Sequence, residues 1–293
     1  MTASTHPYVE TSHLAATKRQ RWLDKLGLYG AFGLLALFAF FPIYWMLLTS
    51  LTPNDQVFQF PPRLFPADVT LEHYASFFDN ASLLRYFQNS VLVSVATAVG
   101  SIVVSAYAAY SFSKFRYRGR TALMFLILSA QMFPQALLLI ALYLMFSELG
   151  LLQSYWSLIL AFTTFTLPLC IWMLKSYFDT IPDDLIEAAK VDGASQRQII
   201  YRILLPITTP ALVSTGLFAF IRGWNDYIYA LTLAGPEKMT LPPGLALTFI
   251  GEFQTSWPSL MAASLIVSLP IVVVFLFMQR YITGGLTAGA IKG

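Results

Sequence analysis

Charge is the first thing this sequence has little of. Only 11% of its 293 residues are Asp, Glu, Lys or Arg, and 57% are hydrophobic, whereas soluble globular chains carry about 25% charged residues. The charges are confined to short segments between long runs that contain none. This pattern excludes a soluble globular fold and indicates a chain that has the lipid bilayer as its solvent.

Groups that support bond chemistry are also sparse. The single cysteine, Cys170, lies in an apolar run, so it excludes an intrachain disulfide and a thiolate metal site, and we expect a small buried residue there. The three histidines, His6, His13 and His73, fall in dispersed polar segments, and no paired carboxylates or nucleophile motif accompany them. We therefore expect neither enzymatic activity nor a bound metal.

Two further classes of protein are disfavoured by what is missing. There is no phosphate-binding loop of the form G-x-x-x-x-G-K-[ST], so any ATP would have to be bound by another chain. A net charge of +3 is too small to indicate a nucleic-acid partner. The first apolar run begins late, near Leu26, and is too long for a cleavable signal peptide.

Long uncharged stretches are what the chain does have, and there are six of them. At 1.5 Å per residue each can cross a hydrocarbon core of about 30 Å, and lipid requires them to be helical because every backbone polar group needs an internal partner. The fold class predicted is an all-α integral membrane protein with six transmembrane helices. The stretches are 26–54, 86–113, 121–147, 149–174, 203–221 and 253–279.

Orientation follows from the distribution of Lys and Arg, because positive residues are retained on the cytoplasmic side. Fourteen of the eighteen lie in alternate segments, which are 1–25, 114–120, 175–202 and 280–293. Both termini are therefore expected in the cytoplasm. The domains predicted are a cytoplasmic N-terminal segment (1–25), a permease domain (26–282) and a cytoplasmic C-terminal tail (283–293).

The segment 180–206 between the fourth and fifth spans is patterned as two short helices with a hinge. Thr180 is suited to cap the first helix, with Pro182 in its first turn, and Gly193 is suited to stop it in a left-handed conformation. Ser195 and Gln198 have the spacing of a capping box for the second helix. An amphipathic hairpin along the membrane surface is predicted. The apolar face of its second arm is formed by Ile199, Ile200, Ile203 and Leu204.

The amino-acid sequence of this hairpin resembles the EAA loop of binding-protein-dependent ABC importers. The resemblance rests on Glu187-Ala188-Ala189, Asp192-Gly193-Ala194 and Ile203-x-Leu205-Pro206. From about residue 20 onward the chain is similar to the MalG-type permeases of carbohydrate importers related to the maltose transporter. In that family the loop is a coupling element that docks into a cleft on the cytoplasmic ATPase subunit.

The resemblance implies roles for individual residues of the loop. Glu187 would form a salt bridge with a basic residue of the ATPase subunit, although a local pair with Lys190 is the alternative. Ala188 and Ala189 would permit close docking, and Gly193 would set the angle between the two helices. The set of coupling residues implied is Glu187, Ala188, Ala189, Asp192, Gly193 and Pro206.

The family resemblance also covers the C-terminus and the outer side. The ending 285–293 matches the tail that reaches between the two ATPase subunits, with contacts expected from Thr287, Gly289 and Lys292. Near the outer end of span five, a translocation path or outer gate is assigned to Trp224, Asn225 and Asp226, with Arg222 one turn from Asp226 if the helix continues. A contact with the sugar-binding protein is assigned to Gly235, Pro236, Glu237 and Lys238.

The function implied is that of a permease subunit of an ABC importer for a sugar, a di- or oligosaccharide in particular, in a bacterial or archaeal plasma membrane. Its partners would be a second, MalF-like permease, two ATPase subunits that bind ATP and Mg, an extracytoplasmic sugar-binding protein and membrane lipid. Two other classes compete with it. An ion-coupled secondary transporter would show mid-membrane ionisable residues and an internal repeat, and an intramembrane enzyme would need a convergent set of reactive side chains.

Overall fold

The structure, a computed structural model, describes residues 10–66, 68–251 and 255–290, with side chains described from 22 to 279 within those ranges. The described chain is helical and has one isolated β-bridge, between Ile250 and Thr255. The longer helices are α1 (Glu10–Leu51), α3 (Ala81–Lys114), α5 (Gln135–Glu148), α6 (Tyr155–Asp179), α10 (Thr209–Asn225) and α13 (Trp257–Ala290). The shorter ones are α2 (Glu72–Asp79), α4 (Arg120–Ser129), α7 (Asp183–Val191), α8 (Gln196–Gln198), α9 (Leu205–Ile207), α11 (Ile228–Leu233) and α12 (Leu241–Phe249), with 3-10 turns η1 (Ala130–Met132) and η3 (Pro236–Lys238) and a π-helix η2 (Ile199–Leu204).

Four helices in the described chain are long and apolar enough to cross a membrane, and the number rises to six if two bent pairs are each counted as one span. The four are Trp22–Leu51 of α1, α3, α6 and Trp257–Gln279 of α13. The stretches expected as the third and fifth spans are the bent pairs, with angles of 98° between α4–η1 and α5 and 86° between Gln196–Ile207 and α10. Each of these two stretches was predicted as a spanning helix, and the structure bends it, so the count of six spans stays a prediction.

Proline explains both breaks. Phe133 precedes Pro134 and has extended backbone angles (φ −73°, ψ 133°), as the steric clash with a following proline ring favours. The second break lies at Thr208, between Pro206 and Pro210, and Pro210 occupies the first turn of α10. A proline is tolerated in a first turn but supplies no N–H to a continuing helix. Each break thus coincides with a missing backbone donor.

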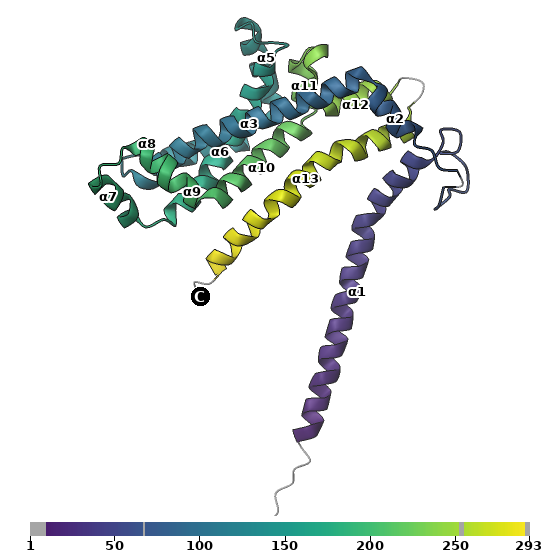
Figure 1. Cartoon of the computed structure of the whole chain (residues 1–293), viewed down its shortest axis with the longest axis horizontal. Coiled ribbons are helices and arrows are strands. Elements are labelled where there is room, and N and C mark those ends of the chain that lie inside the picture. Colours follow the sequence, from purple (N-terminus) through teal and green to yellow (C-terminus); the bar gives the residue numbers. More distant parts are fainter. Residues whose placement is uncertain (1–9, 67, 252–254, 291–293) are drawn as a thin grey trace, which may run out of the picture.

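The core is made by α3, α6 and α10, which lie side by side along the long axis of the molecule (Figure 1), and the hydroxyls of Ser101 and Thr166 are 2.6 Å apart where α3 meets α6. Helix α13 lies along α10, whereas α1 diverges from the rest and approaches it only near its C-terminal end (Figure 1). Only 6% of the apolar window of α1 is buried within the chain. Nearly all of its apolar surface is therefore left for lipid or for another chain.

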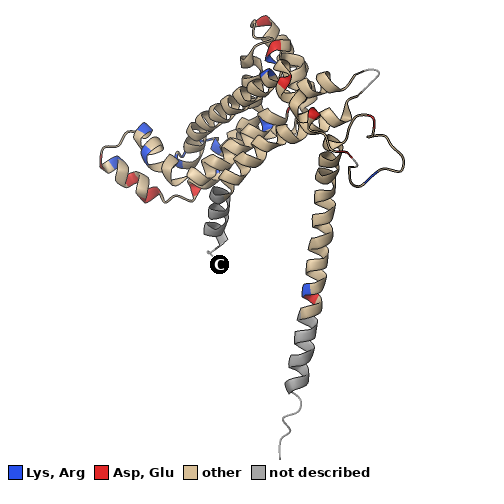
Figure 2. Cartoon of the chain, turned by 45° about the vertical axis from the view of Figure 1, so that its right-hand side comes forward, with Lys and Arg blue, Asp and Glu red and all other residues tan. Residues whose placement is uncertain are grey.

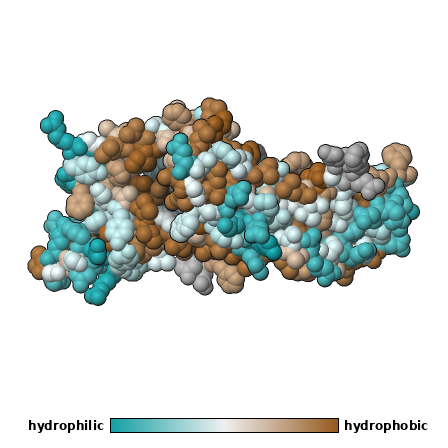
Figure 3. Space-filling model, turned by 90° about the horizontal axis from the view of Figure 1, so that it is seen from above, coloured by the Kyte–Doolittle hydropathy of each residue, from teal (hydrophilic) through white to brown (hydrophobic). Residues whose placement is uncertain are grey.

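Short helices lie toward the two ends of this bundle. The hairpin α7–α9 lies at one end and α2 at the other, with α12 near α2 and α11 beside α5 (Figure 1). Charged residues are concentrated at these ends, and the helices between them are almost free of charge (Figure 2). A space-filling view likewise shows hydrophilic residues at the hairpin end with hydrophobic surface beside it (Figure 3). This distribution of polar and apolar surface is that of a membrane-embedded bundle whose two ends face water.

Candidate functional site

The first arm of the hairpin, α7, begins two residues later than the sequence predicts, with Pro182 and not Thr180 as its N-cap residue. Pro182 occupies the N-cap position, and Asp183 and Asp184 fill the first turn, where negative charge suits the helix dipole. Thr180 does not cap α7, because it ends α6 and its hydroxyl donates to the Tyr177 carbonyl at 2.7 Å. The prediction that Thr180 caps α7 was wrong. The carboxylates of Asp183 and Asp184 instead provide the favourable interaction with the N-terminal end of the helix dipole.

Gly193 ends α7 as predicted. Its φ is +80°, a left-handed conformation that glycine adopts without steric penalty. The Ala194 N–H donates to the Ala189 carbonyl at 2.9 Å, and the Gly193 N–H donates to the Lys190 carbonyl at 3.0 Å. These two bonds are a complete Schellman motif, so the turn between the two arms is defined by backbone hydrogen bonding at one glycine.

The second arm begins with the predicted capping box. The Gln198 N–H donates to the Ser195 hydroxyl at 3.4 Å, and the Ser195 N–H donates to the Gln198 side chain at 2.7 Å. The arm then continues as the π-helix η2 rather than as an α-helix, with the Leu205 N–H donating to the Ile200 carbonyl. Pro206, which follows, has no N–H for the usual bond one turn back. The short π segment therefore ends directly before a residue pair in which the second member has no backbone donor.

Burial gives the hairpin a distinct inner and outer face. Its inner face packs against α3 and α6 in one hydrophobic cluster, so the predicted apolar face of the second arm is confirmed. Ala189 also belongs to this face, with only 8% of its surface exposed, and it is not available for a partner. The cluster includes Ala106, Ala109, Tyr110, Leu174, Phe178, Ile186, Ala189, Ile199, Ile200 and Leu204.

The outer face of α7 combines charge with exposed apolar surface. Glu187, Ala188 and Asp192 are exposed, and Glu187 forms no ion pair with Lys190 or with any other side chain in the described part of the chain. Sequence reasoning overlooked Leu185 and Val191 on this helix, which are 42% and 88% exposed. The sequence could have indicated them, because both are apolar residues at positions where an amphipathic helix is usually polar. Such a surface is suited to docking onto another protein.

The hairpin is tied to the bundle by a half-buried ion pair. The Lys114 ammonium at the end of α3 lies 2.8 Å from Asp183 Oδ1 and donates to the Ile181 carbonyl at 2.6 Å. The hydrogen bond and the positive charge of Lys114 hold the pKa of the Asp183 carboxyl below its ordinary value. This contact fixes the start of α7 beneath α3.

At the opposite end, the Trp224–Asn225–Asp226 cluster is split between packing and capping. Trp224 is 1% exposed, with its ring stacked on Phe220 and edge-on to Phe87. Asn225, the last residue of α10, is exposed. A tryptophan buried among aromatic rings stabilises the junction of α3 and α10, so the structure places Trp224 in the packing of the bundle.

Asp226 does not pair with Arg222. Helix α10 ends at Asn225, and the Asp226 carboxylate accepts hydrogen bonds from the Tyr229 and Ala230 N–H groups at 2.9 and 3.2 Å. Arg222 instead donates to the side chain of Gln135 at the start of α5. The condition for an Arg222–Asp226 pair was that the helix continues, and it is not met, because Asp226 leaves the helical conformation to cap α11.

We expect Asp226→Ala to lower the stability of the solubilised protein by about 1 kcal/mol, the usual cost of losing a helix cap. Asp226→Asn should retain the stability because its amide oxygen can still accept both bonds. The temperature at which half of the detergent-solubilised protein aggregates would measure this. Loss of transport in the Asp226→Asn protein at unchanged stability would show instead that the charge itself is required, as for a residue of the translocation path.

The loop assigned to a binding-protein contact is only half accessible. Pro236 and Glu237 are exposed, whereas Gly235 is buried against the side chain of Gln153. The Lys238 ammonium lies 5.7 Å from the centre of the Tyr155 ring, within cation–π range. A partner approaching this end would therefore meet Pro236 and Glu237 first.

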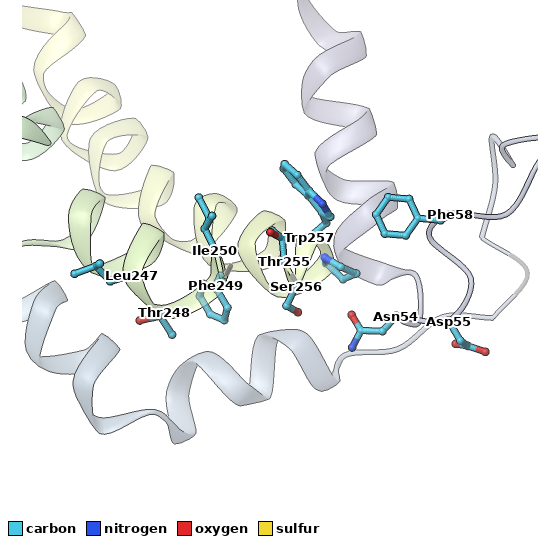
Figure 4. A pocket seen from close by; sticks show the side chains of 12 residues that line it. Asn54, Asp55, Phe58, Leu247, Thr248, Phe249, Ile250, Thr255, Ser256 and Trp257 are labelled. Carbon is cyan, nitrogen blue, oxygen red and sulfur yellow. The ribbon is translucent and has the colours of Figure 1, made fainter. Parts of the chain in front are cut away.

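A cavity of about 850 Å³ opens at this end between the loop after α1 and the connection from α12 to α13 (Figure 4). Phe58 and Trp257 contribute aromatic rings to its lining, and Asn54, Asp55 and Ser256 supply polar groups (Figure 4). Aromatic walls with a few polar groups are typical of sites for small polar molecules. None of the residues predicted from the sequence lines it.

The tail contacts predicted from the sequence lie at the limit of the described chain. The backbone of Thr287 and Gly289 belongs to α13, but the side chain of Thr287 and all of Lys292 lie outside the described residues. The boundary predicted at residue 25 falls inside α1. In the described part of the chain no three His, Cys, Asp or Glu residues lie close enough to hold a metal, and the expectation that the chain binds none stays a prediction.

Comparisons with known proteins agree with this geometry. Residues 101–287 match the family model described as binding-protein-dependent transport system inner membrane component. The chain is 37% identical to the inner membrane ABC transporter permease protein YcjP of Escherichia coli (94% of this chain, 99% of that one). It is 36% identical to the trehalose/maltose transport system permease protein MalG of Thermococcus litoralis (89% and 94%).

A solved structure shares both fold and sequence with the chain. It is the crystal structure of a bacterial ABC transporter involved in the import of the acidic polysaccharide alginate, with a TM-score of 0.76, 25% identity and coverage of 94% of this chain and 99% of that one. The chain therefore belongs to the family of binding-protein-dependent transport system inner membrane components.

Proposed function

We propose that this chain is the permease subunit of an ATP-binding-cassette importer that carries a sugar, with a di- or oligosaccharide as the preferred size. The observation that carries the proposal is the outer face of α7. Glu187 there has no ion-pair partner among the described residues, and it lies among exposed apolar residues on a hairpin whose inner face packs against the bundle. In a family defined by dependence on partner proteins, such a face is suited to bind an ATPase subunit.

The arrangement proposed has six spans, with each bent pair counted as one crossing, and both termini on the same side of the membrane as the hairpin. The distribution of Lys and Arg supports the cytoplasm as that side. The exposed Pro236 and Glu237 then face the outside, where an extracytoplasmic binding protein would deliver the solute. This agrees with a solved alginate ABC transporter in complex with a pentasaccharide-bound periplasmic protein, which shares the fold.

The remaining partners are assigned by the surfaces that this chain leaves uncovered. The nearly unburied α1 would pack against a second, MalF-like permease as well as lipid. ATP and Mg would be bound by two ATPase subunits, one of them docked on Glu187, Ala188, Asp192 and Gly193 and on the region of Pro206. The C-terminal Thr287, Gly289 and Lys292 would reach between those subunits.

We expect the ATPase subunit to co-purify with this chain from membranes and to be lost when Glu187 is replaced by Lys. Glu187 is the only charged residue of α7 that is exposed and lies in the middle of the helix, and this substitution reverses its charge. Asp184→Lys, in the first turn of the same helix, is a matched control that should retain most of the subunit. The amount of co-purified ATPase, measured by quantitative immunoblotting, decides between the two outcomes.

An ion-coupled secondary transporter is the competing function, and one measurement separates the two. Vesicles that contain the purified complex should take up the sugar only when ATP is hydrolysed in the vesicle lumen, which corresponds to the cytoplasm. Uptake driven by a proton or sodium gradient in the absence of nucleotide would refute the proposal. The sugar itself is identified by calorimetric titration of the cognate binding protein.

A further inference from the structure

The outer loop is held to α3 by one buried side chain. The Asn89 amide donates to the carbonyl oxygens of Glu237 and Met239 at 2.9 and 2.8 Å, and the Tyr155 hydroxyl donates to the Asn89 oxygen at 2.8 Å. Asn89 is 3% exposed. Both of its donors and its acceptor are thus used, and the loop backbone has its partners on α3.

The neighbouring residue completes this outer attachment. The fully buried Ser90 hydroxyl accepts a hydrogen bond from the Leu241 N–H at 2.8 Å, at the point where the loop enters α12. Removing a partner of buried backbone groups costs more than the bond itself contributes. Segment 237–241 is therefore constrained to follow the outer end of α3.

At the other end, α3 contacts both arms of the hairpin. Lys114, whose side chain is 6% exposed, contacts Asp183 and the Ile181 carbonyl at the start of α7. The Tyr110 hydroxyl donates to the Gln196 side chain of α8. The hydroxyls of Tyr107 and Tyr201, the latter in η2, are 2.8 Å apart. The inner end of α3 is thus attached to the first and the second arm alike.

Between these attachments α3 is continuous. Asn89 and Lys114 are 25 positions apart on one helix, which corresponds to about 38 Å at 1.5 Å per residue. Of the three helices packed around the hairpin, α6 contains Pro168 and α10 starts with Pro210 at an 86° bend, whereas α3 contains no proline. Because kinks and bends occur at proline, α3 is the helix best able to transmit a displacement along its axis.

We infer that α3 is a mechanical link between the two partner-binding ends, with Lys114 as the positioning residue at the hairpin and Asn89 as the positioning residue at the outer loop. This inference rests on the proposed function, because it takes the hairpin as the surface for the ATPase. A displacement of the hairpin is passed to α3 through Lys114 and reaches loop 235–241 through Asn89. Coupling between sites is reciprocal, so a partner on the outer loop acts on the hairpin by the same path.

The test uses the assembled complex of this chain, the second permease and two ATPase subunits, with a non-hydrolysable ATP analogue and Mg as the probe. Hydrogen exchange of backbone amides is measured in 183–191 and in 235–241, with and without the analogue. In the wild type both segments should change. In Lys114→Met the hairpin should still respond, but the response of the outer loop should fall by at least about fivefold, the lower end of usual coupling factors.

Matched controls separate this path from general loosening. Lys175→Met breaks the Lys175–Asp179 pair at the same membrane side, and Asn80→Ala removes the cap of α3 without touching the loop; both should keep the response of the outer loop. Asn89→Ala should retain the response of the hairpin and lose that of the loop. If Lys114→Met does not assemble, Tyr110→Phe removes the bond to α8 instead and should weaken the response of the outer loop.

A response of the outer loop that persists in both Lys114→Met and Asn89→Ala would overturn the inference and leave the proposed function intact. If the analogue changes neither segment of the wild type, the proposed function fails, and the inference fails with it. The two failures are therefore distinguishable, because both segments still respond in the wild type in the first case and neither responds in the second.

Discussion

Replacing Gly193 with Val is expected to reduce the sugar taken up per ATP hydrolysed by about tenfold, while the bundle remains inserted and ATP hydrolysis continues. The reason is the backbone angle φ of +80°, which costs a residue with a Cβ roughly 1–2 kcal/mol, and about 1.4 kcal/mol corresponds to a factor of ten. Apart from Gly193 itself and its two neighbours in the chain, no heavy atom of the described residues lies within 4 Å of the position that a Cβ would occupy. The penalty is therefore conformational and falls on the turn itself.

The turn can relieve that penalty only by changing the angle between α7 and the second arm. Both arms are anchored to the bundle by buried side chains, Ile186 on the first and Leu204 on the second, so the outer face of α7 would tilt relative to its partner. Uptake and hydrolysis measured in the same reconstituted vesicles give the ratio directly. Gly193→Asn is the control, because asparagine tolerates the left-handed region, and it should keep the ratio near that of the wild type.

An unchanged ratio for Gly193→Val would contradict the role of the turn. It would mean that the Schellman bonds from Gly193 and Ala194 to the carbonyls of Lys190 and Ala189 survive the substitution, or that the angle they define does not matter for coupling. Hydrogen exchange at the amides of Gly193 and Ala194 distinguishes these two explanations, since the first predicts unchanged protection and the second predicts lost protection with normal transport.

The parts of the fold that sequence predicted correctly depend on neighbouring residues. The turn at Gly193 and the capping box of Ser195 and Gln198 each follow from chemistry within a few positions. The hydrophobic helices were predictable for a similar reason, because a lipid bilayer requires long apolar segments to be helical. These signals act over one or two turns, so the printed sequence contains them completely.

The parts that sequence reasoning missed are set by contacts between distant residues. Arg222 donates to Gln135 across 87 positions, which removes the partner that Asp226 was expected to have. Ala189 faces α3 and α6 although its neighbour Ala188 faces outward, and the repeated alanine gives no sign of this difference. The bend at Phe133–Pro134 was readable from the proline, but its size of 98° depends on what the two halves pack against.

The contrast between the two alanines leads to the other large effect we expect. Ala188→Trp should reduce co-purification of the ATPase subunit by one to two orders of magnitude, because a large ring placed in a close-packed interface costs about 1–3 kcal/mol. The hairpin itself should remain folded, since Ala188 is exposed and contributes nothing to the buried cluster. Resistance of the 180–206 segment to limited proteolysis would confirm this.

Ala189→Trp should fail in the opposite way. Ala189 packs in the cluster with Ile186 and Ile200, so the ring would force α7 away from the bundle and make the segment sensitive to protease. Ala122→Trp, at an exposed alanine in α4, controls for the bulk of the added ring and should leave both readouts unchanged. The contrary result would be that Ala188→Trp retains the ATPase subunit while Ala189→Trp loses it without any gain in protease sensitivity. In that case the docking surface would include the side of α7 that the structure shows as packed. The outer face with Glu187 and Ala188 would then not be the surface that binds the ATPase.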